Sequence, residues 1–252
     1  MEIWLMTAAA NLAVGALVGL CGVAGFLLPI FYTAVLGMNV SEGLALSFAA
    51  FIVAGALGAW NYQKAGNLDV KFGLKLSCGS LIGAILGVRL NLIIPEEQVK
   101  ILLYLVVLLS GGSILVRKEK EKATGKNGKT MEENLPITLI VGLVTGAICS
   151  MSGAGGPILV MPLLVVFGIP IRTAIGVALF NSVFIGIPAV IGYAGQCDLM
   201  KLLPILLIAL VTQGIGVYFG SRNAAQINQV ALKRGIAIFS ILIAVWKLIE
   251  IF

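Results

Sequence analysis

Two stretches of this 252-residue chain are diverged copies of each other, and each contains a glycine-rich break between apolar segments. The first copy has glycines at 22 and 25, a Gly-x-x-Asp turn at 66–69 and a row of small residues that ends at Arg89. The second copy repeats these landmarks about 130 residues later, which indicates a tandem duplication. Its matching residues are Gly153, Gly155 and Gly156, then the turn 195–198, then Arg222.

Composition shows in which medium these copies fold. Hydrophobic residues make up 60% of the chain and charged residues 11%, and the mean hydropathy is +1.08, so the sequence predicts an integral membrane protein. The net charge of +6 does not indicate a nucleic-acid partner, because the basic residues fall in loops that flank apolar segments and favour a role in topology. Met1 to Trp4 lack the basic stretch of a signal peptide, and we expect them to begin the first helix.

Ten apolar segments follow one another along the chain, and their lengths decide how they meet the membrane. A full crossing takes about 20 residues. Segments 157–168 and 24–37 are both shorter than this, and 24–37 is only slightly longer than 157–168. The sequence predicts that these two are the returning arms of re-entrant hairpins, paired with 136–150 and 3–20. The six segments expected to cross the membrane are 43–62, 71–93, 99–116, 173–194, 202–220 and 232–251.

Each copy then holds one hairpin and three crossings, and this odd number places the two copies in opposite orientations. The predicted fold is an all-α integral membrane protein of two inverted-topology repeats, 1–116 and 136–252, joined by a polar cytoplasmic linker at 117–135. With the amino terminus outside, 13 of the 17 basic residues fall on the cytoplasmic side, as the positive-inside rule requires. This bias does not test the hairpins, since counting each arm as a full crossing gives the same parity. The basic residues left outside are Arg89, Lys100, Lys201 and Lys247.

The second break runs from Cys149 to Pro157 and carries no charge that would hold it at a water interface. Unwound backbone at membrane depth is tolerated only where it is buried in protein or lines a cavity. Pro157 suits the first turn of the returning helix, where its missing N–H is unneeded. Backbone N–H groups converging at the positive end of that helix would form a site for an oxyanion, unless the small residues serve only close packing of the two breaks. The candidate residues here are Gly153, Gly155 and Gly156, with Ser150 and Ser152 as hydroxyl donors.

The first break is expected to face the second and contributes Gly22 and Gly25. Each break also carries a cysteine, Cys21 in the first and Cys149 in the second. Two thiols brought together could handle a reactive sulfur substrate, because the thiolate is the nucleophile. The alternative is that cysteine is simply a small residue suited to a crowded turn. The four cysteines show no metal-ligand spacing, and we expect neither a metal site nor a disulfide framework.

Polar side chains near the expected midplane are few. Asn181 and Ser182 lie in the middle of segment 173–194, Gln213 lies in the middle of segment 202–220, and Ser47 sits less deeply in the first copy. Such groups either bond one helix to another or line a substrate path, and the sequence leaves both readings open.

Two further patterns predict structure rather than chemistry. Gly79, Gly83 and Gly87 recur every four residues, which is the spacing of a helix contact face. Asp69 and Asp198 each stand just before a helix, where a carboxylate caps the backbone. Enzymatic functions find no support, because the chain has no histidine for a Ser-His dyad and its two aspartates lie at membrane edges. No cofactor is expected.

Taken together, these features resemble the sulfite exporter family, the TauE/SafE-type membrane permeases, over nearly the whole length. The resemblance rests on the two glycine-rich breaks followed by apolar residues and a proline, on the Gly-x-x-Asp turns, and on the small-residue rows ending in Arg89 and Arg222. Family members typically show a fuller Gly-x-Gly-Gly-Gly tip and an Ala-x-Gly-Thr-Ser-Leu stretch after it. Here the first tip has only Gly22-Val23-Ala24-Gly25, and the Thr-Ser pair is Leu46-Ser47 in the first copy and Val177-Ala178 in the second.

The resemblance implies movement of sulfite, sulfonates or related small organic anions across the cytoplasmic membrane, usually outward. Outward movement needs no built-in proton carrier, since each negative charge leaving a negative interior gains roughly 2.3 kcal/mol per 100 mV. An importer would need coupling, and the carboxylates of this chain lie at segment ends or in loops. The alternatives left open are a passive anion channel and an uptake permease for a sulfur compound such as thiosulfate.

Overall fold

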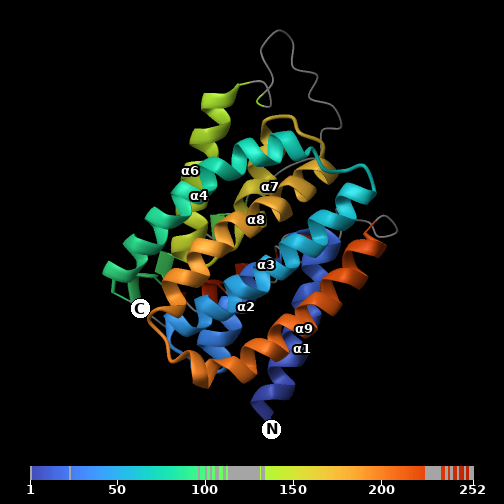
Figure 1. The fold of residues 1–252 in the computed structure, drawn as a ribbon. Helices are drawn as coiled ribbons and strands as arrows, with labels where there is room; N and C mark the ends of the chain where they lie inside the picture. The colour runs from blue at the N-terminus through green and yellow to red at the C-terminus, as the bar shows by residue number, and fades with distance from the viewer. Residues whose placement is uncertain are drawn as a thin grey trace.

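The computed structural model describes residues 2–22, 24–95, 97–99 and 134–224, and every regular element in these ranges is helical (Figure 1). It also describes scattered positions outside them, namely 101, 102, 104, 105, 108, 109, 112, 131, 234, 235, 238, 241, 242, 244–246, 248 and 249. In chain order the elements are α1 (Glu2–Cys21), η1 (Ala24–Phe26), α2 (Leu27–Ile30), η2 (Phe31–Val35), α3 (Val40–Lys64), α4 (Val70–Ile93), α6 (Leu135–Ser152), α7 (Gly156–Val166), α8 (Ile171–Ala194) and α9 (Leu199–Asn223).

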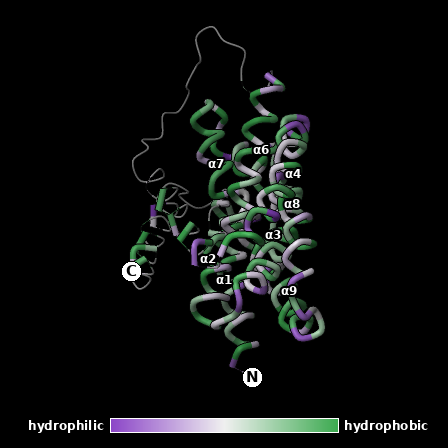
Figure 2. The backbone as a smooth tube through the Cα atoms, turned by 90° about the vertical axis from the view of Figure 1, so that its left-hand side faces the viewer, coloured by the Kyte–Doolittle hydropathy of each residue, from purple (hydrophilic) through white to green (hydrophobic). Residues whose placement is uncertain are grey.

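Among the described residues, six helices are long and apolar enough to cross a bilayer: α1, α3, α4, α6, α8 and α9. Hydrophobic residues dominate their length in Figure 2, as expected of helices that face lipid and one another. The prediction of an all-helical, multi-pass membrane protein is therefore confirmed, and α3, α4, α8 and α9 match four of the predicted crossings. The other two predicted crossings, 99–116 and 232–251, and most of the linker 117–135 lie outside the described residues.

The two helices predicted as first hairpin arms are longer than a hairpin needs. α1 has 20 residues and α6 has 18, so each is about 30 Å long and could cross a bilayer alone. The arms that follow them are short, at Ala24–Val35 and Pro157–Val166. The structure thus gives each hairpin one long and one short arm, and the re-entrant geometry itself stays a prediction.

The first helix of each copy packs against a helix of the other copy. α1 packs along α9, α6 packs along α4, and α3 packs against α8 between those two pairs (Figure 1). The same separation of about 131 residues relates α1 to α6 and α4 to α9, so the two flanking pairs are equivalent. α3 and α8 run in opposite directions, because Gly58 on α3 faces Leu179 while Gly186 faces Phe48. Halves of opposite orientation would pack in this way, although the inverted repeat across a bilayer stays a prediction.

The row of small residues on α4 is a helix contact face, as predicted. A Cβ atom on Gly79, Gly83 or Gly87 would collide with carbonyl oxygens of α6. In the equivalent pair, a Cβ atom on Gly216 or Gly220 of α9 would collide with carbonyl oxygens of α1. Both pairs therefore bring their backbones too close for any side chain at these positions.

The helix-cap prediction for the two aspartates is also confirmed. The carboxylate of Asp69 accepts a hydrogen bond of 2.9 Å from the N–H of Phe72 at the start of α4. The carboxylate of Asp198 accepts one of 3.2 Å from the N–H of Met200 at the start of α9. Each satisfies one of the backbone donors that a helix leaves unpaired in its first turn.

Candidate functional site

Both breaks begin with the same backbone turn. Gly22 follows α1 with a φ of +73°, and Gly153 follows α6 with a φ of +71°. Their N–H groups donate to the carbonyl oxygens of Val18 at 2.8 Å and Cys149 at 3.0 Å. A glycine in the left-handed region commonly ends a helix because it satisfies a final carbonyl without a Cβ clash. The glycines are thus required by the backbone at the start of each break.

Beyond that turn the second break differs from the first. Gly155 takes a second left-handed conformation, with a φ of +76°, and α7 then starts with Pro157 in its first turn, as predicted. In the first break, Gly22 is the one described residue with a positive φ, and the chain re-enters helical turns at Ala24. The second break therefore leads directly into the N-terminus of a regular α-helix, whereas the first passes through a 3-10 turn and a π turn.

The two breaks meet on opposite edges of the Phe51 ring in the middle of α3. A Cβ atom on Gly25 would lie 3.0 Å from this ring, and one on Gly155 would lie 3.2 Å from it. A cavity of about 10 Å³ lies at the junction, lined by both breaks together with Phe51 and with Ser182 of α8. A space of this size holds about one water molecule. The described residues that line it carry no charged side chain.

The structure brings some of the sequence-predicted residues to this cavity and leaves others around it. Its lining includes Gly22, Gly25, Gly155 and Ser182. Gly156 is the first residue of α7. The remaining predicted residues are buried but do not contribute to the lining, and these are Cys21, Ser47, Cys149, Ser150, Ser152, Gly153, Asn181 and Gln213.

The four candidate serines direct their hydroxyl protons at carbonyl oxygens of their own helices. The hydrogen-bond lengths run from 2.6 Å at Ser47 to 3.1 Å at Ser150, with 2.7 Å at Ser152 and at Ser182. Each hydroxyl has a single proton to donate. These side chains would have to rotate away from the helix before they could donate to a bound anion.

Each cysteine thiol of the two breaks is also engaged locally. Cys21 donates from its sulfur to the carbonyl oxygen of Leu17 at 3.0 Å. The sulfur of Cys149 accepts a hydrogen bond from the N–H of Leu159 in the first turn of α7. All four cysteines are free thiols. Cys149 thus links the end of α6 to the start of α7.

Asn181 and Gln213 stand out among the buried polar residues. Both are fully buried, and neither amide nitrogen nor amide oxygen of either side chain has a hydrogen-bond partner within the described structure. Gln213 packs against α1. A Cβ atom added to Gly15 of α1 would lie 3.2 Å from the Oε1 atom of Gln213. An unsatisfied buried amide costs about 1–3 kcal/mol, and native proteins contain few of them. These two amides therefore leave their hydrogen-bonding capacity unused among the described residues.

Phe51 is the residue that the sequence analysis missed. Its ring separates the two breaks, and its carbonyl oxygen lies 3.5 Å from Ser182 Oγ. The same 131-residue separation that relates Gly22 to Gly153 relates Phe51 to Ser182. Aligning the two copies marks this position as one where they differ in size and polarity, but the place of Phe51 between the breaks becomes visible only in the fold.

Comparison with known proteins adds a second line of findings. The family model described as sulfite exporter TauE/SafE matches residues 3–246. A probable membrane transporter protein of Haemophilus influenzae is 27% identical over 251 residues, which cover 92% of each chain. The probable membrane transporter protein YdhB of Bacillus subtilis is 23% identical over 218 residues, which cover 85% of this chain and 87% of that protein. No solved structure matches.

Proposed function

Because the chain belongs to the sulfite exporter TauE/SafE family, we propose that it is a secondary transporter that carries a small oxyanion out of the cell across the cytoplasmic membrane. The proposed substrate is sulfite, a sulfonate or a related organosulfur anion. A transporter rather than an enzyme agrees with the relatives, which are named as probable membrane transporters.

The observation that carries this proposal is the meeting of the two breaks at Phe51. Gly25 and Gly155 lie against the same ring, and the N-terminus of α7 begins at that point. Broken helices that meet in a membrane protein form binding sites, because half-helix N-termini direct their positive dipole ends at anionic groups. No charged side chain lines the junction among the described residues, so binding would rest on backbone N–H groups and neutral donors.

Asn181 and Gln213 supply the neutral donors in this proposal. Their amides are buried without partners, and an anion oxygen would give each nitrogen the hydrogen bond that it lacks. The junction cavity of about 10 Å³ is too small for sulfite. We therefore propose that the two breaks separate around the substrate and that the described arrangement is a closed form of the site.

The proposed topology has both termini outside and a re-entrant hairpin at each break. Cysteine labelling on a background without native cysteines tests it. A cysteine placed at Asn127 should react only from the cytoplasm, and one placed at Gln196 only from outside. Labelling at position 127 from outside in intact cells would overturn the orientation.

Flux measured in proteoliposomes tests the function itself. A carrier for sulfite should show saturable flux and counterflow, whereas a channel would show ohmic current without saturation. Thermal shifts with sulfite, thiosulfate, sulfoacetate and small carboxylates identify the bound anion in the same preparation. Stabilisation by thiosulfate alone, together with inward flux, would replace the export proposal with an uptake permease.

A further inference from the structure

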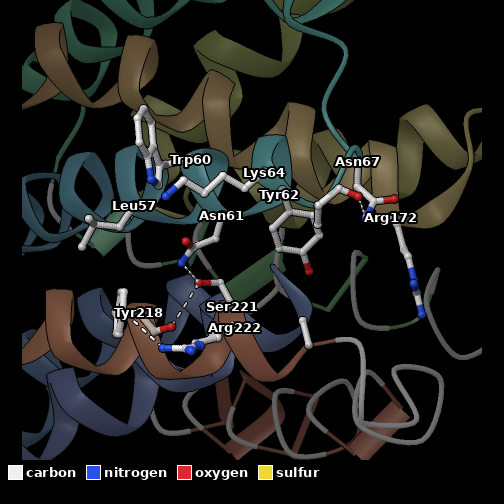
Figure 3. Close-up of a pocket in the computed structure, with 12 residues that line it drawn as sticks. Leu57, Trp60, Asn61, Tyr62, Lys64, Asn67, Arg172, Tyr218, Ser221 and Arg222 are labelled. Carbon is white, nitrogen blue, oxygen red and sulfur yellow. Dashed lines mark hydrogen bonds between the residues drawn. The ribbon is translucent and has the colours of Figure 1, made fainter.

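A second and much larger cavity lies away from the junction. It is a crevice of about 620 Å³ between the C-terminal ends of α3 and α9, with the start of α8 at one side. Figure 3 shows Asn61 and Tyr62 reaching from α3 toward Ser221 and Arg222 on α9. The Nδ2 atom of Asn61 donates to Ser221 Oγ at 2.7 Å, which ties the two helices together across the crevice.

The crevice is lined by positive charge. Lys64, Arg172 and Arg222 are among its described lining residues, and none of those residues is a carboxylate. Lys64 lies over the Trp60 ring, with Nζ 4.9 Å from the ring centroid, and Arg222 Nη1 donates to Tyr218 Oη at 3.3 Å (Figure 3). Cations gathered around a concave surface without counter-charges raise the local concentration of small anions.

The crevice also touches the first break. The Tyr62 hydroxyl, which lines the crevice, donates to the carbonyl oxygen of Leu20 at 3.5 Å. Leu20 lies in the last turn of α1, two residues before the left-handed Gly22 that lines the junction cavity. An anion held in the crevice would therefore lie next to the backbone that closes one side of the proposed site.

The equivalent residues beside the second break pack differently. Tyr193 stands 131 residues after Tyr62, and its fully buried hydroxyl donates to the carbonyl oxygen of Ser150 at 2.7 Å. A Cβ atom on Gly192, which corresponds to Asn61, would collide with Val88 of α4. Among the described residues the pseudo-equivalent ends thus differ: Asn61 and Tyr62 line a cationic crevice, whereas Gly192 packs against Val88 and Tyr193 is fully buried.

From these contacts we propose that the crevice is a binding site for a small oxyanion at the cytoplasmic end of the transport path. The inference rests on the proposed function, because the crevice would be the site where the exported anion binds before it enters the junction. The lining cations all belong to the side that the positive-inside rule assigns to the cytoplasm. The phosphate of an anionic lipid headgroup offers the same chemistry, and the experiment below separates the two sources.

Trp60 provides a reporter inside the crevice. The chain has three tryptophans, so the W4F/W246F variant leaves Trp60 as the single fluorophore. Iodide quenching of Trp60 in detergent reports local anion concentration, and acrylamide quenching reports neutral accessibility. The variant R172Q/R222Q is compared with the matched control R89Q/K201Q, since each lowers the formal net charge from +6 to +4.

We expect R172Q/R222Q to lower the iodide quenching constant by roughly twofold or more and the control to leave it unchanged. Acrylamide quenching and the unfolding temperature should stay the same in both, because all four replaced side chains are exposed. Equal iodide quenching in the two variants, with unchanged acrylamide quenching, would overturn the proposal.

Competition then identifies the occupant. Sulfite should protect Trp60 from iodide in a saturable manner, and this protection should weaken in R172Q/R222Q but not in R89Q/K201Q. Protection by phosphatidylglycerol in mixed micelles, with none by sulfite, would make the crevice a lipid headgroup site and overturn the proposal. Neither readout needs flux, so a crevice that fails this test leaves saturable sulfite flux and the proposed function intact.

Discussion

The two breaks begin alike and end differently. Each starts at a left-handed glycine after a helix of bilayer length, Gly22 after α1 and Gly153 after α6. The second break then adds Gly155 and starts the 11-residue helix α7, whereas the first continues as short 3-10, α and π turns to Val35. The turn that ends each long helix is therefore common to both copies. Among the described residues, the helix N-terminus that suits an anion follows the second break and not the first.

The side chains around the two breaks also differ between the copies. In the second copy Asn181 and Ser182 are buried and Ser182 lines the junction cavity, whereas the positions 131 residues earlier are Ala50 and Phe51. Gln213 stands 133 residues after Ser80, the separation that also relates Gly83 to Gly216, and the Ser80 hydroxyl donates to the carbonyl oxygen of Gly142 on α6. The second copy thus supplies polar groups, and the first supplies an aromatic ring and packing contacts. We infer that binding and closure have been divided between the copies.

The largest expected effect is at Gly155. Gly155→Val should abolish transport while the protein still reaches the membrane, because a valine is strained at a φ of +76° and would press on the Phe51 ring. The matched change Gly25→Val meets the same ring without a left-handed backbone and should retain part of the flux. Sulfite uptake into proteoliposomes, normalised to the amount inserted, measures both. Normal transport by Gly155→Val would show that the second break serves packing only.

Substitutions at Phe51 and Ser182 test whether binding and closure are divided between the two copies. Phe51→Ala should lower the stability of the unloaded protein by about 3–5 kcal/mol, the usual loss when a buried aromatic side chain is truncated. Ser182→Ala should cost less than about 1 kcal/mol, because the hydroxyl bonds mainly within its own helix. Unfolding monitored in detergent compares the two. Similar losses would mean that Phe51 does not hold the breaks apart. Phe51→Ala should also admit larger sulfonates relative to sulfite.

Much of this arrangement follows from the sequence because its signals are local. Pro157 in the first turn of α7 and the caps at Asp69 and Asp198 are properties of short segments, and the structure has each of them where it was expected. The glycine-rich breaks also lie at helix ends, and the structure adds that Gly22, Gly153 and Gly155 take positive φ angles there. The exchanged pairing of the helices also agrees with the duplication, since equivalent glycine rows face equivalent backbones in both flanking pairs.

The remaining features depend on tertiary contacts that no local pattern encodes. Phe51 in an apolar helix gives no signal of its own, and its place between the breaks becomes visible only in the fold. Lys64, Arg172 and Arg222 each read as an ordinary basic residue at a helix end, yet α3, α8 and α9 gather them around one crevice. Ser150 and Ser152 were expected as hydroxyl donors to an anion, but each hydroxyl bonds to a carbonyl oxygen of its own helix.

The unpartnered amides predict an intermediate effect. Asn181→Ala or Gln213→Ala should raise the half-saturating sulfite concentration by roughly tenfold or more, since a hydrogen bond to a charged group contributes about 1.5–3 kcal/mol. Stability without substrate should change little, because neither amide has a partner to lose. The first-copy control Ser80→Ala removes a bond between α4 and α6 and should leave half-saturation unchanged. Lost stability with unchanged half-saturation would make the amides structural and return the site to the two breaks alone.

The smallest difference is expected at the two helix caps. The Asp69 carboxylate makes the shorter bond, 2.9 Å against 3.2 Å for Asp198, so Asp69→Ala should lower the free energy of unfolding by about 1 kcal/mol and Asp198→Ala by less. The salt bridge of Asp198 to Lys201 is exposed and adds little. Asparagine at either position should restore the stability, because its side-chain oxygen also caps a helix. Half-saturation should not change in any of these variants, since both caps lie at helix ends away from the junction. A raised half-saturation in Asp69→Ala alone would show that the loop beside the crevice, rather than the breaks, controls access in the first copy.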